Sequence, residues 1–150
     1  MQAGVRQTVS LDVDGKTDDR HGKPIPLRGR VRTLSDGLFF ETQPRHGGWG
    51  AGDQGLTAVL ETEEQHTIVL TSHRMAPMSL EQILSLGIKP ERKQMVIVKG
   101  VIAPRAAYEP VEAEIILVDT PGATSADPSR FPYRARRTPL YPLEKDARYE

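Results

Sequence analysis

Apolar and polar residues alternate in the first part of the sequence, and this alternation restricts the fold more than any other feature. In Val5–Asp14 (VRQTVSLDVD) the valines and Leu11 occupy every second position. In Ile25–Leu34 (IPLRGRVRTL) apolar residues can face inward while the arginines face outward. A period of two predicts β-strands with one buried face.

Turn residues separate the predicted strands and indicate how they pair. Ser35-Asp36-Gly37 predicts a tight turn that joins Ile25–Leu34 to Leu38–Thr42 as a hairpin. Leu56–Thr62 and Thr67–Thr71 flank the polar turn EEQH and predict a second hairpin. The glycine-rich stretch between the hairpins, Gln43–Gly55, predicts no regular element.

A helix is predicted after Ser79 because Ser79 and Gln82 have the spacing of a capping box. Leu80, Ile83, Leu84 and Leu86 would form its apolar side, and Gly87 stands where a glycine ends a helix.

The remaining segments read as strand, helix and strand. Met95–Lys99 (MVIVK) and Ile115–Val118 are apolar runs that predict buried strands. Ala106–Ala113 between them is helix-like, and Pro110 predicts that this helix is short or bent. Alternation of strands and helices favours parallel pairing.

Together these elements predict an α+β fold with a mixed sheet. We expect antiparallel hairpins in the N-terminal half, then a small β-α-β-α-β unit, and an extended tail over residues 123–150. The length of 150 residues suits a single domain covering 1–150.

Composition excludes several classes of protein. Lys+Arg and Asp+Glu both number 20, and this balance argues against a nucleic-acid partner. The chain has no cysteine, so disulfides and thiol chemistry are excluded. The start of the chain lacks the apolar segment of a signal peptide, and no apolar run approaches ~18 residues. We therefore expect a cytoplasmic domain that contacts no membrane.

Motif searches predict no catalytic residue and no metal ligand in this chain. The run EIILVDTPG (114–122) resembles the Asp-x-x-Gly turn of nucleotide hydrolases, but Gly15-Lys16-Thr17 lacks the first glycine of a phosphate-binding loop. There is no G-x-S-x-G motif. The four histidines, which form no close-spaced ligand pair, are His21, His46, His66 and His73.

A binding cleft is predicted where the expected strands end, because ligands of parallel sheets bind at the carboxyl ends of the strands. Thr71-Ser72, Lys99 and Asp119-Thr120 end three predicted strands, and Arg105 precedes the next helix. An alternative remains that Lys99 and Arg105 form structural ion pairs with Asp119 or Glu109.

Several long segments resemble one family. They are VKG (98–100), RAAY (105–108), AEIILVDTPG (113–122) and PYRARRTPLYPL (132–143). In this order they resemble the C-terminal domain of the microcystinase C (MlrC-type) metallopeptidase family, and the similarity covers nearly the whole chain.

The resemblance implies an accessory, substrate-side domain of a two-domain zinc metallopeptidase that hydrolyses small or linearised peptides. The expected partners are the N-terminal catalytic domain, which would carry the zinc, and a peptide ligand; this chain would carry no cofactor itself. The positions that match the family's motifs are Thr71, Ser72, Lys99, Arg105, Tyr108, Asp119, Thr120, Pro121, Gly122 and Ser125.

From these positions the resemblance implies seven cleft candidates: Thr71, Ser72, Lys99, Arg105, Tyr108, Thr120 and Ser125. We expect Lys99, Arg105 and Ser125 to border the cleft shared with the catalytic domain. A stand-alone ligand-binding or protein-interaction module without catalysis is the alternative function. In isolation, we expect the chain to self-associate as a homo-oligomer.

Overall fold

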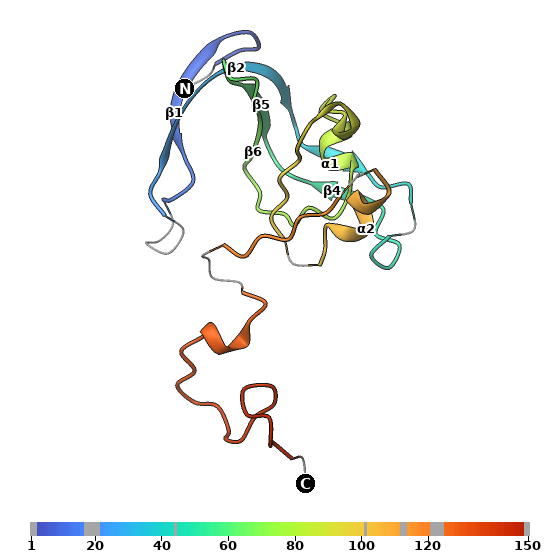
Figure 1. Ribbon diagram of the computed structural model, residues 1–150. Helices are drawn as coiled ribbons and strands as arrows, with labels where there is room; N and C mark the ends of the chain where they lie inside the picture. Colours follow the sequence, from blue (N-terminus) through green and yellow to red (C-terminus); the bar gives the residue numbers. More distant parts are fainter. Residues whose placement is uncertain are drawn as a thin grey trace. The chain divides into compact units, whose positions relative to one another are not determined.

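The computed structural model of the chain describes residues 3–16, 22–43, 45–100, 102–111, 114–120 and 125–148 (Figure 1). It divides into two units, the first formed by Met1–Val13 and Pro24–Ile116 and the second by Asp14–Lys23 and Leu117–Glu150. The strands are β1 (Thr8–Val13), β2 (Ile25–Ser35), β3 (Leu38–Phe40), β4 (Ala51–Asp53), β5 (Thr57–Glu61) and β6 (Thr67–Thr71). The helices are α1 (Glu81–Leu84), η1 (Pro90–Arg92), α2 (Arg105–Tyr108), η2 (Glu109–Val111) and η3 (Pro128–Arg130).

The first unit is mainly β, with a four-stranded sheet in the order β1-β2-β5-β6 and antiparallel pairing throughout. The predicted alternation is confirmed: Val9 and Leu11 lie on the half-buried side of β1 while the residues between them are exposed. In β2 the predicted inward residue Val31 is buried and the arginines are exposed, but Ile25 is exposed. The predicted hairpin of β5 and β6 is also confirmed.

A separate two-stranded sheet pairs β3 with β4. Its packing depends on Gly52, where an added Cβ would lie 2.4 Å from Phe39 Cζ and 2.6 Å from Trp49 Cη2. The Phe39 and Trp49 rings meet edge to face at 5.5 Å between centroids. The absence of a side chain at Gly52 thus makes room for the aromatic pair.

Two hydrophobic clusters form the core of this unit. The first contains Val59 from β5 with Leu86 and Ile88 after α1. The second contains Leu80, Ala107 and Tyr108. Ile83 packs against both clusters. One side chain of α1 therefore connects the sheet to α2.

The capping residues around α1 act nearly as predicted. The Gln82 side chain accepts the N–H groups of Ser79 (3.0 Å) and Met78 (2.8 Å), whereas the Ser79 hydroxyl accepts the N–H of Glu81 (3.1 Å) and not that of Gln82. At the other end the Ile88 N–H donates to the Ile83 carbonyl and the Gly87 N–H to the Leu84 carbonyl. These two bonds form a Schellman motif with Gly87 at φ +74°.

Gly87→Ala is expected to destabilise the unit by about 1 kcal/mol, because an L-residue is strained at this positive φ. The added Cβ would meet no described atom within 4 Å, so the effect is conformational and not steric. Urea denaturation measures it. Gly4→Ala is the control, because Gly4 also has open space around it and lacks a positive φ; equal midpoints for both variants would contradict the prediction.

Three expectations are wrong. First, β2 pairs with β1 and β5, and β3 pairs with β4, so Ser35-Asp36-Gly37 does not join a hairpin. The Ser35 hydroxyl and the Asp36 carboxylate instead accept the N–H groups of Gly37 and Leu38, and the chain leaves the main sheet. Second, the glycine-rich stretch contains β4, because small residues let its chain approach the Phe39 ring.

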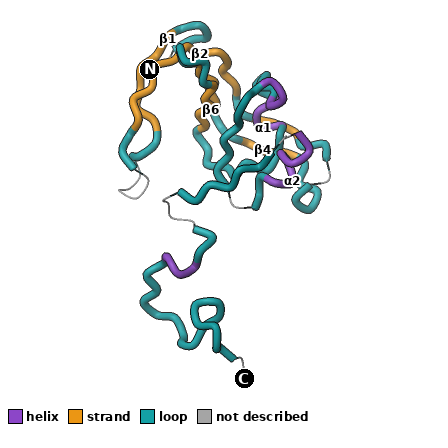
Figure 2. The backbone as a smooth tube through the Cα atoms, viewed as in Figure 1, coloured by secondary structure: helices purple, strands orange, loops and turns teal. Residues whose placement is uncertain are grey.

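Third, the parallel β-α-β-α-β unit does not form among the described residues. Met95–Lys99 and 114–118 are neither strands nor paired, and the long teal loops of Figure 2 include both. An apolar run indicates burial without specifying what buries it, and this ambiguity is the physical reason for the error. The predicted helix shortens to α2 followed by η2 at Pro110, and its last residues, 112–113, lie outside the described residues.

The second unit is held mainly by polar contacts and contains only η3 among its described residues. Arg136 makes a two-pronged contact with Glu144, at 3.0 Å and 2.6 Å. Arg130 pairs with both carboxylate oxygens of Asp119. No helix formed by the described residues has the length and apolar character needed to cross a membrane.

Candidate functional site

The end of β6 brings two predicted cleft residues to one surface hollow. Thr71 is the last residue of β6 and pairs with Thr57 of β5. Beyond it the Ser72 N–H donates to the Leu56 carbonyl at 3.0 Å, which continues the ladder. The hollow has a volume of about 630 Å³ and is lined largely by apolar residues, among them Leu34, Leu56 and Leu70. Thr71 and Ser72 thus supply hydroxyl groups at the border of an apolar surface.

Gly55 allows the turn that positions Ser72. Gly55 has φ +65°, where an L-residue is strained, and an added Cβ would lie 2.2 Å from Ser72 Oγ and 2.9 Å from His73 Cγ, so a larger residue would displace both side chains. His73 Nδ1 lies 3.6 Å from Asp53 Oδ1, which is too far for a strong hydrogen bond. No hydrogen bond joins Ser72 Oγ to the His73 ring. The geometry therefore does not activate Ser72 through His73.

Lys99, Arg105 and Tyr108 gather around the second hydrophobic cluster. Val98 packs against that cluster, which also contains Tyr108. A Cβ at Gly100 would lie 2.9 Å from Pro104, so the chain after Lys99 passes directly against the residue before Arg105. The two cations consequently lie on adjoining stretches of chain.

The three side chains differ in what they can bind. Tyr108 is buried, and burial raises the pKa of its hydroxyl, so its ring serves the core. Arg105 Nη2 lies 3.3 Å from Glu109 Oε1, as the structural alternative anticipated. Lys99 is exposed and makes no hydrogen bond or ion pair to a described residue. Of these two cations, Lys99 is therefore the one without a partner among the described residues.

The other predicted positions belong to the second unit. Thr120 is exposed, and the Ser125 hydroxyl accepts the N–H of Asp127 at 3.1 Å. The Asp127 carboxylate accepts the N–H and hydroxyl of Ser129, and these bonds lower the pKa of Asp127. Asp119 is engaged by Arg130 and not by Lys99 or Arg105. The turn residues Pro121 and Gly122 lie outside the described residues.

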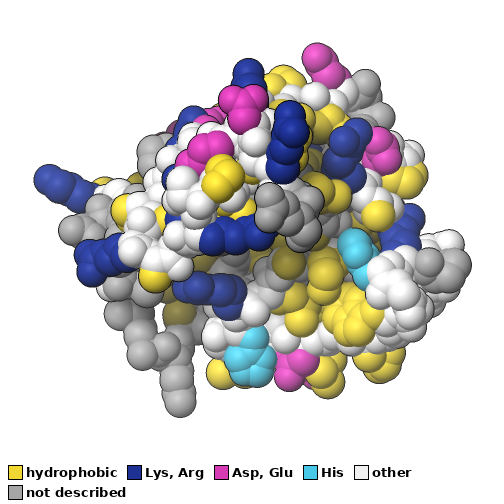
Figure 3. Space-filling view, turned by 90° about the horizontal axis from the view of Figure 1, so that it is seen from below, with side chains coloured by type: hydrophobic (Ala, Val, Ile, Leu, Met, Phe, Trp, Pro, Cys, Tyr) yellow, Lys and Arg dark blue, Asp and Glu magenta, His cyan; other side chains and the backbone are white. Residues whose placement is uncertain are grey.

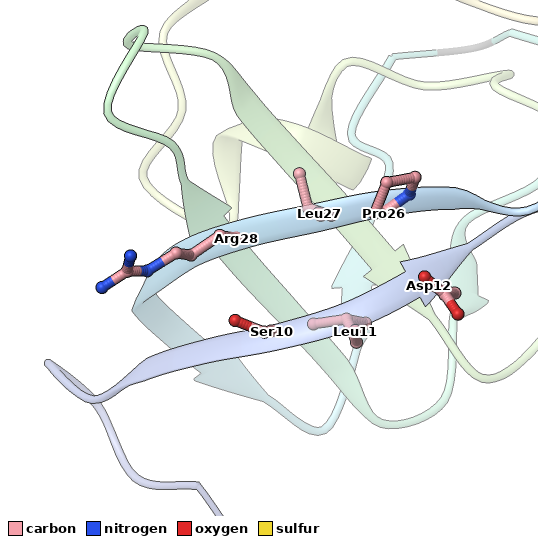
Figure 4. A pocket seen from close by; sticks show the side chains of 6 residues that line it. All are labelled: Ser10, Leu11, Asp12, Pro26, Leu27 and Arg28. Atoms are coloured by element: carbon pink, nitrogen blue, oxygen red, sulfur yellow. The ribbon is translucent and has the colours of Figure 1, made fainter.

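A second hollow, of about 370 Å³, lies on the ribbon formed by β1 and β2. Its polar side chains do not converge: Figure 4 shows Arg28 and Asp12 at opposite ends, with Leu27 and Pro26 between them. It contains none of the predicted residues. A surface of this kind is typical of an exposed hairpin.

Sequence reasoning missed one buried polar cluster. Glu41 Oε2 accepts the Ser79 hydroxyl at 2.6 Å, and Glu41 Oε1 accepts the Gln43 N–H at 2.8 Å. The Gln54 amide donates to the Gln82 carbonyl at 3.0 Å. Within the described residues no buried side-chain nitrogen or oxygen lacks a partner, so this cluster is structurally satisfied. The capping-box spacing signalled Ser79 and Gln82, but nothing local signalled Glu41.

No group of three or more His, Asp or Glu side chains in the described part of the chain could hold a metal ion. His21 lies outside that part. His46 and His66 join no ligand group, and His73 has only Asp53 as a carboxylate neighbour. The residues that the structure describes therefore include no ligand set for a zinc ion.

Comparison with known proteins decides the family. The profile of the MlrC C-terminus family matches residues 1–135. The chain belongs to the MlrC C-terminus family. It is similar to microcystinase C from Sphingomonas sp., with 26% identity over 143 residues, which are 95% of this chain but 26% of that protein.

The MlrC C-terminus fold also occurs in a solved structure. The crystal structure of a "Putative metallopeptidase" from Mesorhizobium sp. BNC1 matches with a TM-score of 0.78 and 26% identity. The match covers 99% of this chain and 29% of that chain. This MlrC domain thus spans less than a third of either relative.

Proposed function

We propose that this chain acts as the accessory, substrate-side domain of a zinc metallopeptidase that hydrolyses small or linearised peptides. The observation that carries the proposal is the length of the relatives: nearly all of this chain matches, yet most of each relative lies outside the match. The zinc and the reacting groups would belong to that other part, because the described residues here form no metal cluster.

The domain's own contribution would be to bind and orient the peptide. Lys99 and Arg105 lie on adjoining stretches of chain and present two positive charges. A cation that meets a peptide carboxylate forms a charge-assisted hydrogen bond, which fixes position as well as adding affinity. The hydroxyl groups of Thr71 and Ser72 border a separate apolar hollow that could accept a side chain of the peptide.

Complementation tests the proposal. This chain would be mixed with the separately produced remainder of microcystinase C, and hydrolysis of linear peptides would be measured with added Zn²⁺. Activity is expected only in the mixture. Activity of this chain alone, or of the remainder at full rate alone, would overturn the accessory role. Peptide binding by this chain without any effect on hydrolysis would favour the stand-alone binding module.

Alanine at the position of Arg105, in a full-length homologue, is expected to raise KM about tenfold with little change in kcat. The estimate corresponds to the loss of one charge-assisted hydrogen bond that ground state and transition state share. Steady-state kinetics with a peptide substrate measures the effect.

Stability provides the control for this variant. The Arg105–Glu109 pair is more than half exposed, so its loss is expected to cost less than about 1 kcal/mol. Glu109→Gln removes the competing carboxylate, and KM should then stay the same or fall. An equal rise of KM in both variants would assign the effect to the ion pair and remove Arg105 from the site.

A further inference from the structure

Met95–Lys99 is an apolar segment that contacts the core through Val98 and is otherwise exposed. Val98 packs against the second hydrophobic cluster. Met95 and Ile97, on the alternate positions, are 73% and 89% exposed. No backbone hydrogen bond joins any residue of 95–99 to another described residue. The segment therefore has the sequence pattern of a strand but no partner strand among the described residues.

A second apolar segment, residues 114–116, has the same character. Ile116 is 70% exposed, and no backbone hydrogen bond links 114–116 to described residues. Leu117 and Val118 continue the apolar run in the second unit and are also exposed. The exposure of apolar side chains therefore extends over two segments and is not confined to one isolated residue.

Free backbone groups and exposed β-branched side chains together form a template for strand addition. Proteins usually protect such edges with proline or with charged residues, and neither occurs within MVIV (95–98) or IILV (115–118). Several exposed large apolar side chains within one short segment are typical of an interface. On the face drawn in Figure 3, hydrophobic side chains reach the surface between Lys and Arg side chains.

We propose that residues 95–99 and 114–116 dock an extended segment of the polypeptide that the relatives carry outside this domain, by β-strand addition. The relatives determine the choice of occupant: the Mesorhizobium structure contains the same fold over 99% of this chain, within a protein of which that fold is only 29%. The domain is thus found with a large covalent neighbour. This inference rests on the proposed function and assigns the surface through which this domain would contact the rest of the peptidase.

The docked segment would add main-chain hydrogen bonds to 95–99 and cover Met95 and Ile97 with apolar side chains. Lys99 is the last residue of this segment, so the same docking would place Lys99 at the border between the domain and its neighbour. The candidate cation and the interface would therefore form one continuous surface.

Hydrogen–deuterium exchange followed by mass spectrometry tests the proposal on this 150-residue chain, alone and mixed with the remainder of microcystinase C. Amides of 95–99 and 114–116 are expected to exchange rapidly in the isolated chain at low concentration. In the complex their exchange should slow by about tenfold or more. Ile97→Lys should abolish the slowing. Ile25→Lys is the matched control, because it adds the same charge at another exposed apolar position.

Each other outcome has a defined meaning. A complex that leaves these amides unprotected would overturn the docking surface while leaving the proposed function intact. A complex with protected amides but no peptide hydrolysis would overturn the proposed function alone. Protection already present in the dilute isolated chain would show that the two segments pair with each other, and protection that rises with chain concentration would assign the surface to a second copy. Absence of any complex would overturn both proposals.

Discussion

Gly37→Ala is expected to destabilise the first unit by about 3 kcal/mol or more. An added Cβ at Gly37 would lie 2.1 Å from the Gly55 carbonyl oxygen and 2.8 Å from Thr57 Oγ1. The nearest atom belongs to the backbone, so a rotamer change cannot relieve the clash. Gly37 also has φ +80°, where an L-residue is strained.

Gly47→Ala separates the two contributions. Gly47 has nearly the same φ, +78°, and an added Cβ there would meet no described atom within 4 Å. We expect this variant to lose only about 1 kcal/mol, the conformational part. Urea denaturation followed by circular dichroism gives both free energies of unfolding. Equal losses in the two variants would show that the turn at Gly37 moves away from Gly55 at little cost.

The contact between Gly37 and Gly55 also explains where sequence reasoning succeeded and failed. Ser35-Asp36-Gly37 was correctly identified as a turn, because its side chains satisfy local backbone groups. The turn was assigned the wrong partner strand, because the contact that directs the chain after Gly37 comes from a residue 18 positions away. Turn chemistry is local, whereas strand pairing depends on such distant contacts.

The helix around Ile83 is predictable from the sequence because its signals are local. Its capping residue, its apolar side and its terminating glycine all lie within nine residues, Ser79 to Gly87. The apolar runs at 95–98 and 115–118 predict buried strands, whereas in the structure only Val98 of these residues packs against the core and the others are exposed. An apolar run predicts burial without specifying which residues bury it, and for these runs no strand pairing among the described residues supplies that burial.

Among the candidate site residues, too, the sequence predicts contacts between neighbours in the chain but not contacts between distant segments. Thr71 and Ser72 share a hollow because they are neighbours in sequence. Tyr108 matched a family motif, yet it lies in the core with Leu80 and Ala107. The contact of Glu41 with Ser79 spans 38 positions, and no periodicity connects those two residues. Polar contacts between distant segments become visible only in the folded chain.

Glu41→Gln is expected to destabilise the first unit by about 2 kcal/mol at neutral pH, because the buried carboxylate accepts hydrogen bonds on both oxygens. Glutamine has only one accepting oxygen. Its NH₂ group would face either the Gln43 N–H or the Ser79 hydroxyl, whose oxygen already accepts the Glu81 N–H. The variant also removes a charge that lies 4.0 Å from Arg45. Urea denaturation at pH 7 measures the loss.

The same variant predicts a pH dependence with a defined sign. The hydrogen bond from Ser79 lowers the pKa of Glu41 in the folded state, although burial opposes this effect. A lowered pKa means that the carboxylate stabilises the folded state fully above the ordinary pKa of glutamate, about 4.3, and that this contribution is lost as the pH falls through the folded-state value. The difference in unfolding free energy between the natural chain and Glu41→Gln should therefore be constant from pH 7 to about 5 and shrink below pH 4. Glu91→Gln, which alters an exposed carboxylate, should show no such convergence. A difference that grows toward low pH would contradict the assignment of Glu41 as a buried, ionised acceptor.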